Sequence, residues 1–285
     1  MNEIGITQGR LSPPVPGRLQ AFPWSSWEEE FSRARGCGFD IVEWLFEAER
    51  YEQNPICTAT GLAKIRRQIA ATGVQLRSVC ASYFMTYPFF RVSEQERARS
   101  ISVLNDLIRR AAALDVRTIL LPVLEASEIR TGLEKVQLLD ALSEPLSLAA
   151  THGIRLGLET ELPASEYRDL VERGNHPALG VYYDAGNAAA RGYDIAADLF
   201  TLSPFLCGVH IKDRKRGGPN VSLGQGDADF VGFFRVLAEV GYTGPLVLET
   251  ASGEDYLSIA SGHLKFVKDR LVWGKSVRPT IRCPE

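Results

Sequence analysis

The sequence predicts an α/β protein, a single-domain (β/α)8 TIM barrel, from three observations. Eight short apolar runs alternate along the chain with eight longer stretches of helical period. The runs are almost continuously apolar, which is typical of strands buried on both faces of a parallel sheet. The length of 285 residues also suits one barrel, because such domains have about 250 residues. The alternative that fits the same pattern is an open, doubly wound sheet.

The eight expected strands are short runs, most of them bounded by turn-forming residues. They cover residues 3–7, 39–45, 74–81, 116–123, 154–159, 179–184, 205–211 and 245–249. The connection after the first strand, residues 8–24, is long and rich in proline. Connections of this kind are either flexible or functional.

The helix candidates separate these runs. Several open on Ser or Asp and several close on Gly, which are the signals for helix starts and ends. They cover residues 26–38, 59–73, 93–114, 132–153, 165–174, 185–200, 229–241 and 254–273. We expect the barrel to occupy residues 1–275 and residues 276–285 to form a loosely held C-terminal tail.

The composition is that of an ordinary globular protein, with 45% hydrophobic and 24% charged residues. A net charge of −3 provides no reason to expect a nucleic acid or an acidic membrane as partner. We see no secretory signal and no apolar stretch of the ~18 to 20 residues that a membrane span needs. Five scattered cysteines without a CxxC spacing predict reduced thiols and a cytoplasmic location. The sequence leaves open whether the protein forms a homo-oligomer.

Four consecutive strands end in residues that can bind a metal ion. These are Glu159, Asp184, His210 and Glu249, separated by 25, 26 and 39 residues. One β/α unit has about 30 residues, and the carboxyl ends of barrel strands converge on one rim, so the four side chains should face one another. Three carboxylates at that distance would repel each other unless a cation held them. The set suits one divalent ion, with Mn²⁺ the first choice, Mg²⁺ or Co²⁺ next, and Zn²⁺ still open.

Each of these residues also has an ordinary structural interpretation. Asp184 could cap the following helix, His210 could be a core histidine, and the two glutamates could be solvated strand ends. Four independent structural roles do not explain why all four residues stand at the same point of four consecutive β/α units. The pattern as a whole therefore favours a metal site.

The motifs around these residues resemble a known family. They are "GFDIVEW", "GLETE", "YYDAGNA", "GVHIKDR" with "SLGQGDADF", and "LVLET". Together they resemble the sugar phosphate isomerase/epimerase family with the xylose-isomerase-like TIM barrel, over nearly the whole chain. This group includes ketose 3-epimerases, hydroxypyruvate isomerases and inosose dehydratases. The resemblance implies the same four metal ligands, with Glu159 and Glu249 also acting as the acid/base pair.

The resemblance also implies roles around the metal. It places Glu43 at the substrate and Asp213, together with Glu161, in support of the ligands. The sequence departs from the family pattern at two positions. Asn187 stands where a histidine is frequent, and Gln225 stands where a glutamate is frequent in the glycine-rich loop.

Further substrate contacts are expected at the rim. Arg214 is a candidate clamp for substrate hydroxyls or a phosphate, and Asn187 lies at the family's substrate-contacting position. Gln8 and Arg10 follow the first strand and could line the rim. Lys212 could contact the substrate or only neutralise the carboxylates.

The predicted activity is that of a divalent-metal-dependent isomerase or epimerase. Its substrate would be a small sugar, sugar phosphate or polyol-derived ketone, with proton transfer through an enediolate between two glutamates. Two alternatives stay open: a metal-dependent dehydratase of the inosose or dehydroshikimate type, and a non-catalytic sugar-binding barrel. A phosphodiesterase is disfavoured, because a multi-zinc site needs many histidines and the chain has 4.

Overall fold

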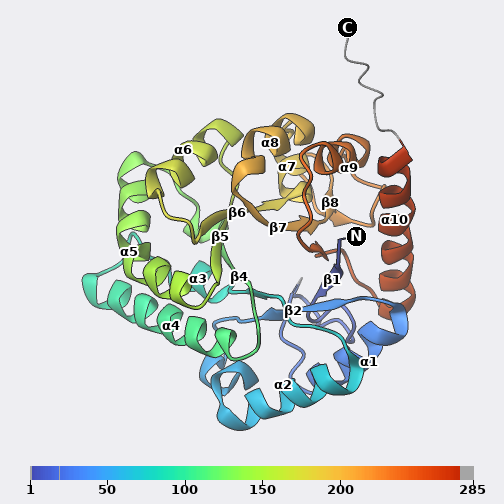
Figure 1. The fold of residues 1–285 in the computed structure, drawn as a ribbon, viewed down its shortest axis with the longest axis horizontal. Helices are drawn as coiled ribbons and strands as arrows, with labels where there is room; N and C mark the ends of the chain where they lie inside the picture. The colour runs from blue at the N-terminus through green and yellow to red at the C-terminus, as the bar shows by residue number, and fades with distance from the viewer. Residues whose placement is uncertain (1, 19, 277–285) are drawn as a thin grey trace, which may run out of the picture.

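A computed structural model describes residues 2–18 and 20–276, with side chains described through Leu271. Eight parallel strands close into a barrel in the order β1-β10-β7-β6-β5-β4-β3-β2, which confirms the predicted fold (Figure 1). The strands are β1 Ile4–Thr7, β2 Ile41–Leu45, β3 Ser78–Cys80, β4 Thr118–Val123, β5 Arg155–Thr160, β6 Leu179–Asp184, β7 Leu206–Ile211 and β10 Leu246–Leu248. Each lies within one of the eight predicted runs or extends one residue beyond it.

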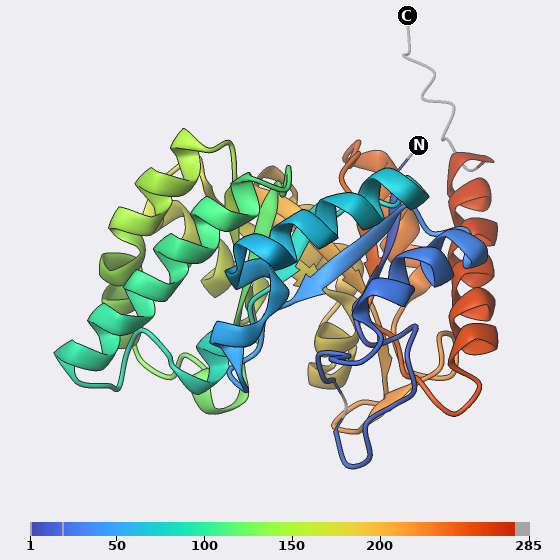
Figure 2. The ribbon, with the colours of Figure 1, turned by 90° about the horizontal axis from the view of Figure 1, so that it is seen from below.

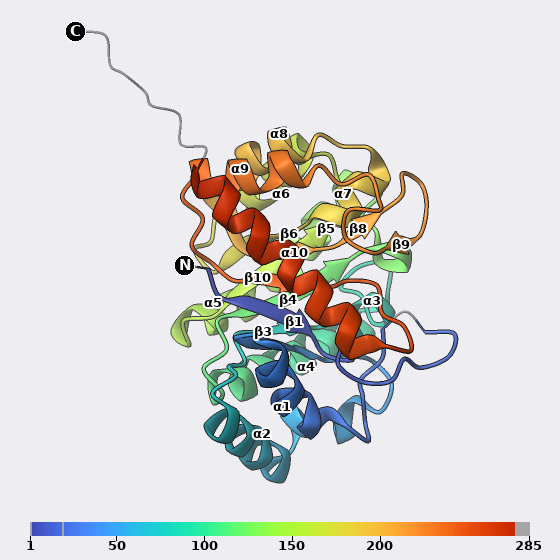
Figure 3. The same cartoon turned by 90° about the vertical axis from the view of Figure 1, so that its right-hand side faces the viewer.

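The helices form a ring around the barrel (Figure 1). They are α1 Trp27–Cys37, α2 Ala59–Thr72, α4 Glu94–Ala112, α5 Gly132–Thr151, α6 Ala164–Gly174, α7 Ala185–Arg191, α8 Ile195–Leu202, α9 Phe230–Glu239 and α10 Tyr256–Ser276. Figure 3 shows α10 crossing between α1 and α9, so the last helix closes the ring against the first. None of the helices in the described part of the chain is long and apolar enough to span a bilayer.

The structure differs from the prediction in four places. The helix expected over 185–200 is two helices, because Gly192 adopts a left-handed conformation (φ 73°) that ends α7, and Asp194 then caps α8. The short helix α3, Tyr83–Thr86, and the antiparallel pair β8 Asp213–Arg214 and β9 Asn220–Val221 were not predicted. Helix α10 continues through Ser276, and the rest of the expected tail lies outside the described residues.

The long connection between β1 and α1 lies at the carboxyl end of the barrel. Figure 2 shows this connection, in dark blue, projecting on the same side as the orange segment that contains β8 and β9. It is tied down by Glu30 of α1, whose carboxylate accepts hydrogen bonds from the backbone N–H groups of Gly9 and Leu11 and from the Ser12 hydroxyl. The connection is therefore anchored over the barrel mouth.

Close packing inside the barrel depends on a glycine. A Cβ atom on Gly208 of β7 would lie 2.2 Å from the ring of Tyr182 on β6. Because position 208 has no side chain, Tyr182 can lie across the barrel interior and reach Glu43 on β2. The contact between Tyr182 and Glu43 supports the residues at the carboxyl end of the barrel.

Candidate active site

The four predicted ligands converge at the carboxyl end of the barrel. Glu159 lies near the end of β5, Asp184 ends β6, His210 lies near the end of β7, and Glu249 follows β10 directly. One ligand atom from each residue lies within 4.8 Å of the other three, and all four residues are buried. The four strand ends that the spacing predicted to face one another thus do come together.

The three carboxylates of the cluster lie in unlike electrostatic environments. Burial and the neighbouring Asp184 raise the pKa of Glu159 to about 8. Burial and the Glu249 charge also raise the pKa of Asp184. Burial acts in the same direction on Glu249, but the Lys212 ammonium and His210 outweigh it and lower the pKa of Glu249 to about 2. The site therefore pairs a carboxyl that holds a proton with one that releases it.

Two buried polar atoms in this cluster are placed to bind a cation. Asp184 Oδ2 and His210 Nδ1 have no hydrogen-bond partner among the described residues. They lie 3.7 Å apart, and His210 Nδ1 is 3.5 Å from Glu249 Oε2. An unpartnered buried polar atom costs roughly 1–3 kcal/mol, which a divalent ion bound to these atoms would offset. Two glutamates, one aspartate and one imidazole are ligands that such an ion accepts, so the residues fit a metal centre.

Glu43 lies beneath His210, whereas the resemblance implied a contact with the substrate. Its Oε1 is 2.7 Å from His210 Nε2, and the carboxylate also accepts hydrogen bonds from Tyr182 (2.6 Å), Ser78 (2.7 Å) and Thr7 (3.2 Å). Both oxygens are thus occupied, and the side chain is fully buried below the ligands. The contact orients the imidazole so that Nδ1 faces the other three ligands.

Lys212 belongs to the cluster itself. Its Nζ donates a hydrogen bond to Glu249 Oε2 (2.8 Å) and lies 3.6 Å from Asp184 Oδ2. Burial lowers the pKa of Lys212, but the charges of Glu249 and Asp184 outweigh it, and the net shift is upward. Gly186 makes room for the lysine stem, because a Cβ there would lie 2.7 Å from Lys212 Cγ. The ammonium thus balances part of the carboxylate charge.

Asn187 and Arg214 form a chain of contacts that ends on Glu159. The Asn187 amide donates to Glu159 Oε1 (2.8 Å), and Arg214 Nη1 donates to Asn187 Oδ1 (3.0 Å). Glu161 does not contact the ligands directly; it forms an ion pair with Arg191 and lies 3.8 Å from Arg214. The asparagine at the family's histidine position therefore orients a ligand.

Asp213 holds a loop and does not contact the four ligands. Its carboxylate accepts backbone hydrogen bonds from Gly224 (2.8 Å), Gly226 (2.9 Å) and Ala228 (3.2 Å). A Cβ on Gly226 would lie 1.9 Å from Asp213 Oδ1, so glycine is required there. The aspartate thus positions the segment "SLGQGDADF" beside the site.

Gln8 and Arg10 are buried and do not line the cavity, contrary to the expectation that they form its rim. Gln8 Oε1 accepts a hydrogen bond from the backbone of Leu45 (3.1 Å). The charge of Arg10 contributes to the low pKa of Glu249.

A cavity of about 780 Å³ opens above Glu159, Lys212 and Glu249. Most of its wall comes from connections that follow β1, β2, β3 and β4, with Cys80 of β3 and Pro122 of β4 beside them. The signal that could have found most of these residues is their place in the connections that leave the carboxyl ends of the strands. They are Arg18, Gln20, Glu47, Ala48, Glu49, Cys80, Ser82, Met85, Thr86, Pro122, Leu124, Glu125 and Ala126.

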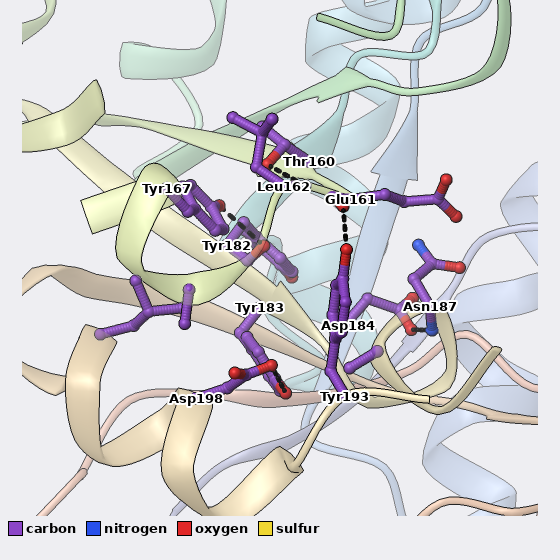
Figure 4. A pocket seen from close by; sticks show the side chains of 13 residues that line it. Thr160, Glu161, Leu162, Tyr167, Tyr182, Tyr183, Asp184, Asn187, Tyr193 and Asp198 are labelled. Atoms are coloured by element: carbon purple, nitrogen blue, oxygen red, sulfur yellow. Dashed lines mark hydrogen bonds between the residues drawn. The ribbon is translucent and has the colours of Figure 1, made fainter. Parts of the chain in front are cut away.

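A second, much smaller hollow lies on the helix side of Asp184 (Figure 4). Its volume of about 20 Å³ has room for roughly one water molecule. The Tyr183 hydroxyl donates to Asp198 there (3.2 Å), and burial raises the pKa of Asp198 to about 6. Tyr193 reaches across the hollow to the backbone oxygen of Glu161. These contacts brace the end of β6 that carries Asp184.

The fold and the site together define a (β/α)8 barrel with a cluster of carboxylates and one histidine at its strand ends. Residues 31–269 match the model of the xylose isomerase-like TIM barrel family, and the chain belongs to this family.

Named relatives are sugar phosphate epimerases. The chain is 29% identical over 239 residues to the putative L-ribulose-5-phosphate 3-epimerase SgbU of Escherichia coli K12, covering 79% of this chain and 83% of the relative. It is 27% identical over 256 residues to the L-ribulose-5-phosphate 3-epimerase UlaE of Escherichia coli O157:H7, covering 86% and 90%.

Solved structures share the fold at lower identity. An L-ribulose 3-epimerase superposes with a TM-score of 0.77 at 18% identity over 100% of both chains. The D-psicose 3-epimerase of Clostridium cellulolyticum H10, solved with D-tagatose, superposes with a TM-score of 0.75 at 18% identity, covering 94% of this chain and 99% of that one.

Proposed function

We propose that this protein is a divalent-metal-dependent epimerase of a small ketose or a related sugar, acting by proton transfer between Glu159 and Glu249. The observation that carries the proposal is the buried cluster of four ligands, in which these two glutamates have opposite pKa shifts. The names of the relatives support epimerisation over the aldose–ketose isomerisation that the same residues could also perform.

The metal ion would be held by Glu159, Asp184, His210 and Glu249, with Mn²⁺ as the first choice. A bound divalent ion supplies Lewis-acid stabilisation of the negative charge that develops on the substrate oxygens, worth several kcal/mol. The protein orients one ligand for this ion, since Glu43 holds His210 by Nε2 and leaves Nδ1 toward the other ligands.

The two glutamates have distinct tasks in this proposal. Glu249, kept ionised by Lys212, takes the proton from the carbon next to the carbonyl group. Glu159, held by Asn187 on the other side of the cluster, supplies a proton. General acid and base steps contribute ~10²- to 10⁴-fold each. Return of the proton to the opposite face of the same carbon produces the epimer.

The same proposal covers the kind of substrate and the location of the protein in the cell. The substrate is a small molecule that enters the cavity above the cluster. The four cysteines within the described residues are free thiols, which supports the cytoplasmic location that we propose from their spacing.

The test is incubation of the metal-loaded protein with a panel of ketoses in D₂O. Deuterium at C3 alone is the expected result. Deuterium at C1 or C2 would indicate an isomerase, and a lack of exchange with every ketose would favour a dehydratase or a sugar-binding protein.

A further inference from the structure

We propose that the site accepts an unphosphorylated sugar, with hydroxyl groups and not a phosphate at the end remote from the metal. The inference rests on the proposed function, because it concerns the substrate of the same site. It starts from the charges on the described part of the cavity wall. Two cations line it, Arg18 and Lys212, against five carboxylates: Glu47, Glu49, Glu125, Glu159 and Glu249.

Both cations of the cavity wall are already paired with carboxylates. Lys212 Nζ lies 2.8 Å from Glu249 and 3.6 Å from Asp184. Arg18 places one Nη atom 3.0 Å from Glu47 and the other 2.6 Å from Glu49. A phosphate is bound through Arg or Lys donors that point at it, commonly two from one guanidinium. Here both Nη groups of Arg18 are directed at protein carboxylates.

Glu47 also keeps Arg18 in this arrangement. The Glu47 carboxylate accepts a hydrogen bond from the backbone of Phe22 (3.2 Å), within the β1–α1 connection that also carries Arg18. A phosphate that displaced Glu47 from the guanidinium would leave a largely buried carboxylate without its cation. The wall is therefore built to keep Arg18 paired.

Glu125 adds an unpaired negative charge to the same wall. It is exposed and forms no ion pair within residues 2–18 and 20–271. Its backbone has φ 51°, in the left-handed region that a residue with a side chain rarely adopts. Such conformations persist where the surroundings impose them, and they gather at functional sites.

An arginine holds the turn that contains Glu125. Arg91 donates to the backbone oxygens of Ala126 (2.6 Å) and Glu128 (3.0 Å) and to the Glu134 carboxylate (2.9 Å). These bonds fix the turn that presents Glu125 to the cavity. The charge of Glu125 is thus positioned by the fold.

Arg214, the other candidate for a phosphate clamp, is also committed. Its donors bond Asn187 Oδ1 (3.0 Å) and the backbone oxygen of Gly218, and it lies 3.8 Å from Glu161. A phosphate carries a charge of about −1.5 to −2 at pH 7 and would meet Glu125 and paired cations in this cavity. Sugar hydroxyls fit better, because Gln20, Ser82 and Thr86 offer neutral donors and acceptors on the same wall.

The test compares kcat/KM for matched pairs of ketopentoses and ketohexoses with and without a terminal phosphate, in the metal-loaded enzyme. For the stereoisomer that the enzyme turns over fastest, we expect kcat/KM to be at least about 10-fold higher without the phosphate. An equal or higher value for the phosphorylated member overturns this inference and leaves the proposed epimerase intact. Turnover of neither member of any pair contradicts the proposed function itself.

A variant pair tests the role of Glu125. Glu125→Gln removes the unpaired charge, and we expect it to raise kcat/KM for the phosphorylated sugar by about two- to fivefold relative to the free sugar, the size of an exposed charge interaction. Glu128→Gln makes the same charge change at a nearby position that does not line the cavity, so the ratio should stay unchanged. An unchanged ratio in Glu125→Gln, or an equal change in both variants, contradicts the assignment.

Discussion

The two halves of the barrel mouth are built differently. On the half formed by β5, β6, β7 and β10, the functional groups lie on the strands or directly after them, and their ligand atoms lie within 4.8 Å of one another. On the half formed by β1, β2, β3 and β4, the cavity is lined mainly by residues of the connections, with Cys80 and Pro122 as the two that lie on strands.

The difference follows from what each half has to do. Metal ligands must be placed to a fraction of an ångström, which neighbouring strands in register supply. A substrate wall must reach out over the barrel, and only connections can do so. The wall compensates with anchors that lie away from the cavity, namely Glu30 under the β1–α1 connection and Arg91 under the turn that carries Glu125. In the proposed function, the chemistry therefore depends on the strand half and the choice of substrate on the connection half.

The largest expected effect lies on the strand half. Glu249→Gln keeps the size of the side chain and removes the proposed base, so kcat should fall by about 10³-fold or more, since a general base contributes ~10² to 10⁴ and a ligand charge is lost as well. Steady-state kinetics and far-UV circular dichroism would check activity and fold together. Glu239→Gln, an exposed position on α9, serves as the control. Near-normal turnover in Glu249→Gln would remove this residue from the acid/base role.

The next largest effect concerns the anchor of the connection half. Burial raises the pKa of Glu30 to about 7, above its usual value of 4.5. The protonated form is thus favoured in the folded state, so its stabilising effect is complete below pH 4.5 and is lost as the pH rises through 7. In the wild type, the free energy of unfolding should therefore fall by up to about 3 kcal/mol as the pH rises from 4.5 to 7. Glu30→Gln has no titrating group at this position and should lack this part of the fall.

Urea unfolding between pH 4.5 and 7.5 would measure this prediction, with the exposed neighbour Glu29→Gln as the matched control. Parallel pH profiles for Glu30→Gln and the wild type would contradict it.

A third prediction sharpens the role of the residue beneath the ligands. Glu43→Gln removes the carboxylate that orients His210, and we expect the affinity for Mn²⁺ to fall by about 10- to 100-fold, or roughly 1.4–2.7 kcal/mol. Isothermal titration calorimetry would measure it. Tyr182→Phe removes one donor to the same carboxylate and should have a smaller effect. A loss of activity at full metal affinity would instead place Glu43 at the substrate, as the sequence first suggested.

The smallest expected effect concerns Arg91, which holds the turn that carries Glu125. A lysine at position 91 cannot make the three bonds of the guanidinium at once, so Arg91→Lys should lower the unfolding free energy by about 1–2 kcal/mol. It should also raise KM a few-fold with kcat within twofold, roughly, because the strand half is untouched. Thermal melting and steady-state kinetics would test both parts. A fall in kcat with an unchanged KM would show that the two halves are not separable in this way.

Strand and ligand positions could be predicted because they follow from local patterns. The apolar runs located all eight barrel strands. Spacings of 25, 26 and 39 residues placed Glu159, Asp184, His210 and Glu249 at equivalent points of successive units. Parallel strands then bring equivalent points to one rim, so no tertiary information was needed to expect the cluster.

Glu43 shows why other roles could not be predicted. The resemblance suggested a substrate contact for Glu43, but its side chain is fully buried inside the barrel and contacts His210 and Tyr182, which lie far away in the sequence. Lys212 was ambiguous for a similar reason, since the sequence does not tell whether a residue after a strand turns toward the cluster or the solvent.

The sequence by itself determined the barrel, the strand ends and the set of residues that can hold a divalent ion, because periodicity and spacing encode them along the chain. The tertiary structure alone decided that Glu43 and Lys212 support the ligands from below and beside. It also decided that Arg18 is paired with Glu47 and Glu49, and that Glu125 faces the cavity. The physical reason is that these contacts join residues from separate connections, whose paths are set by packing and buried hydrogen bonds and not by any local pattern.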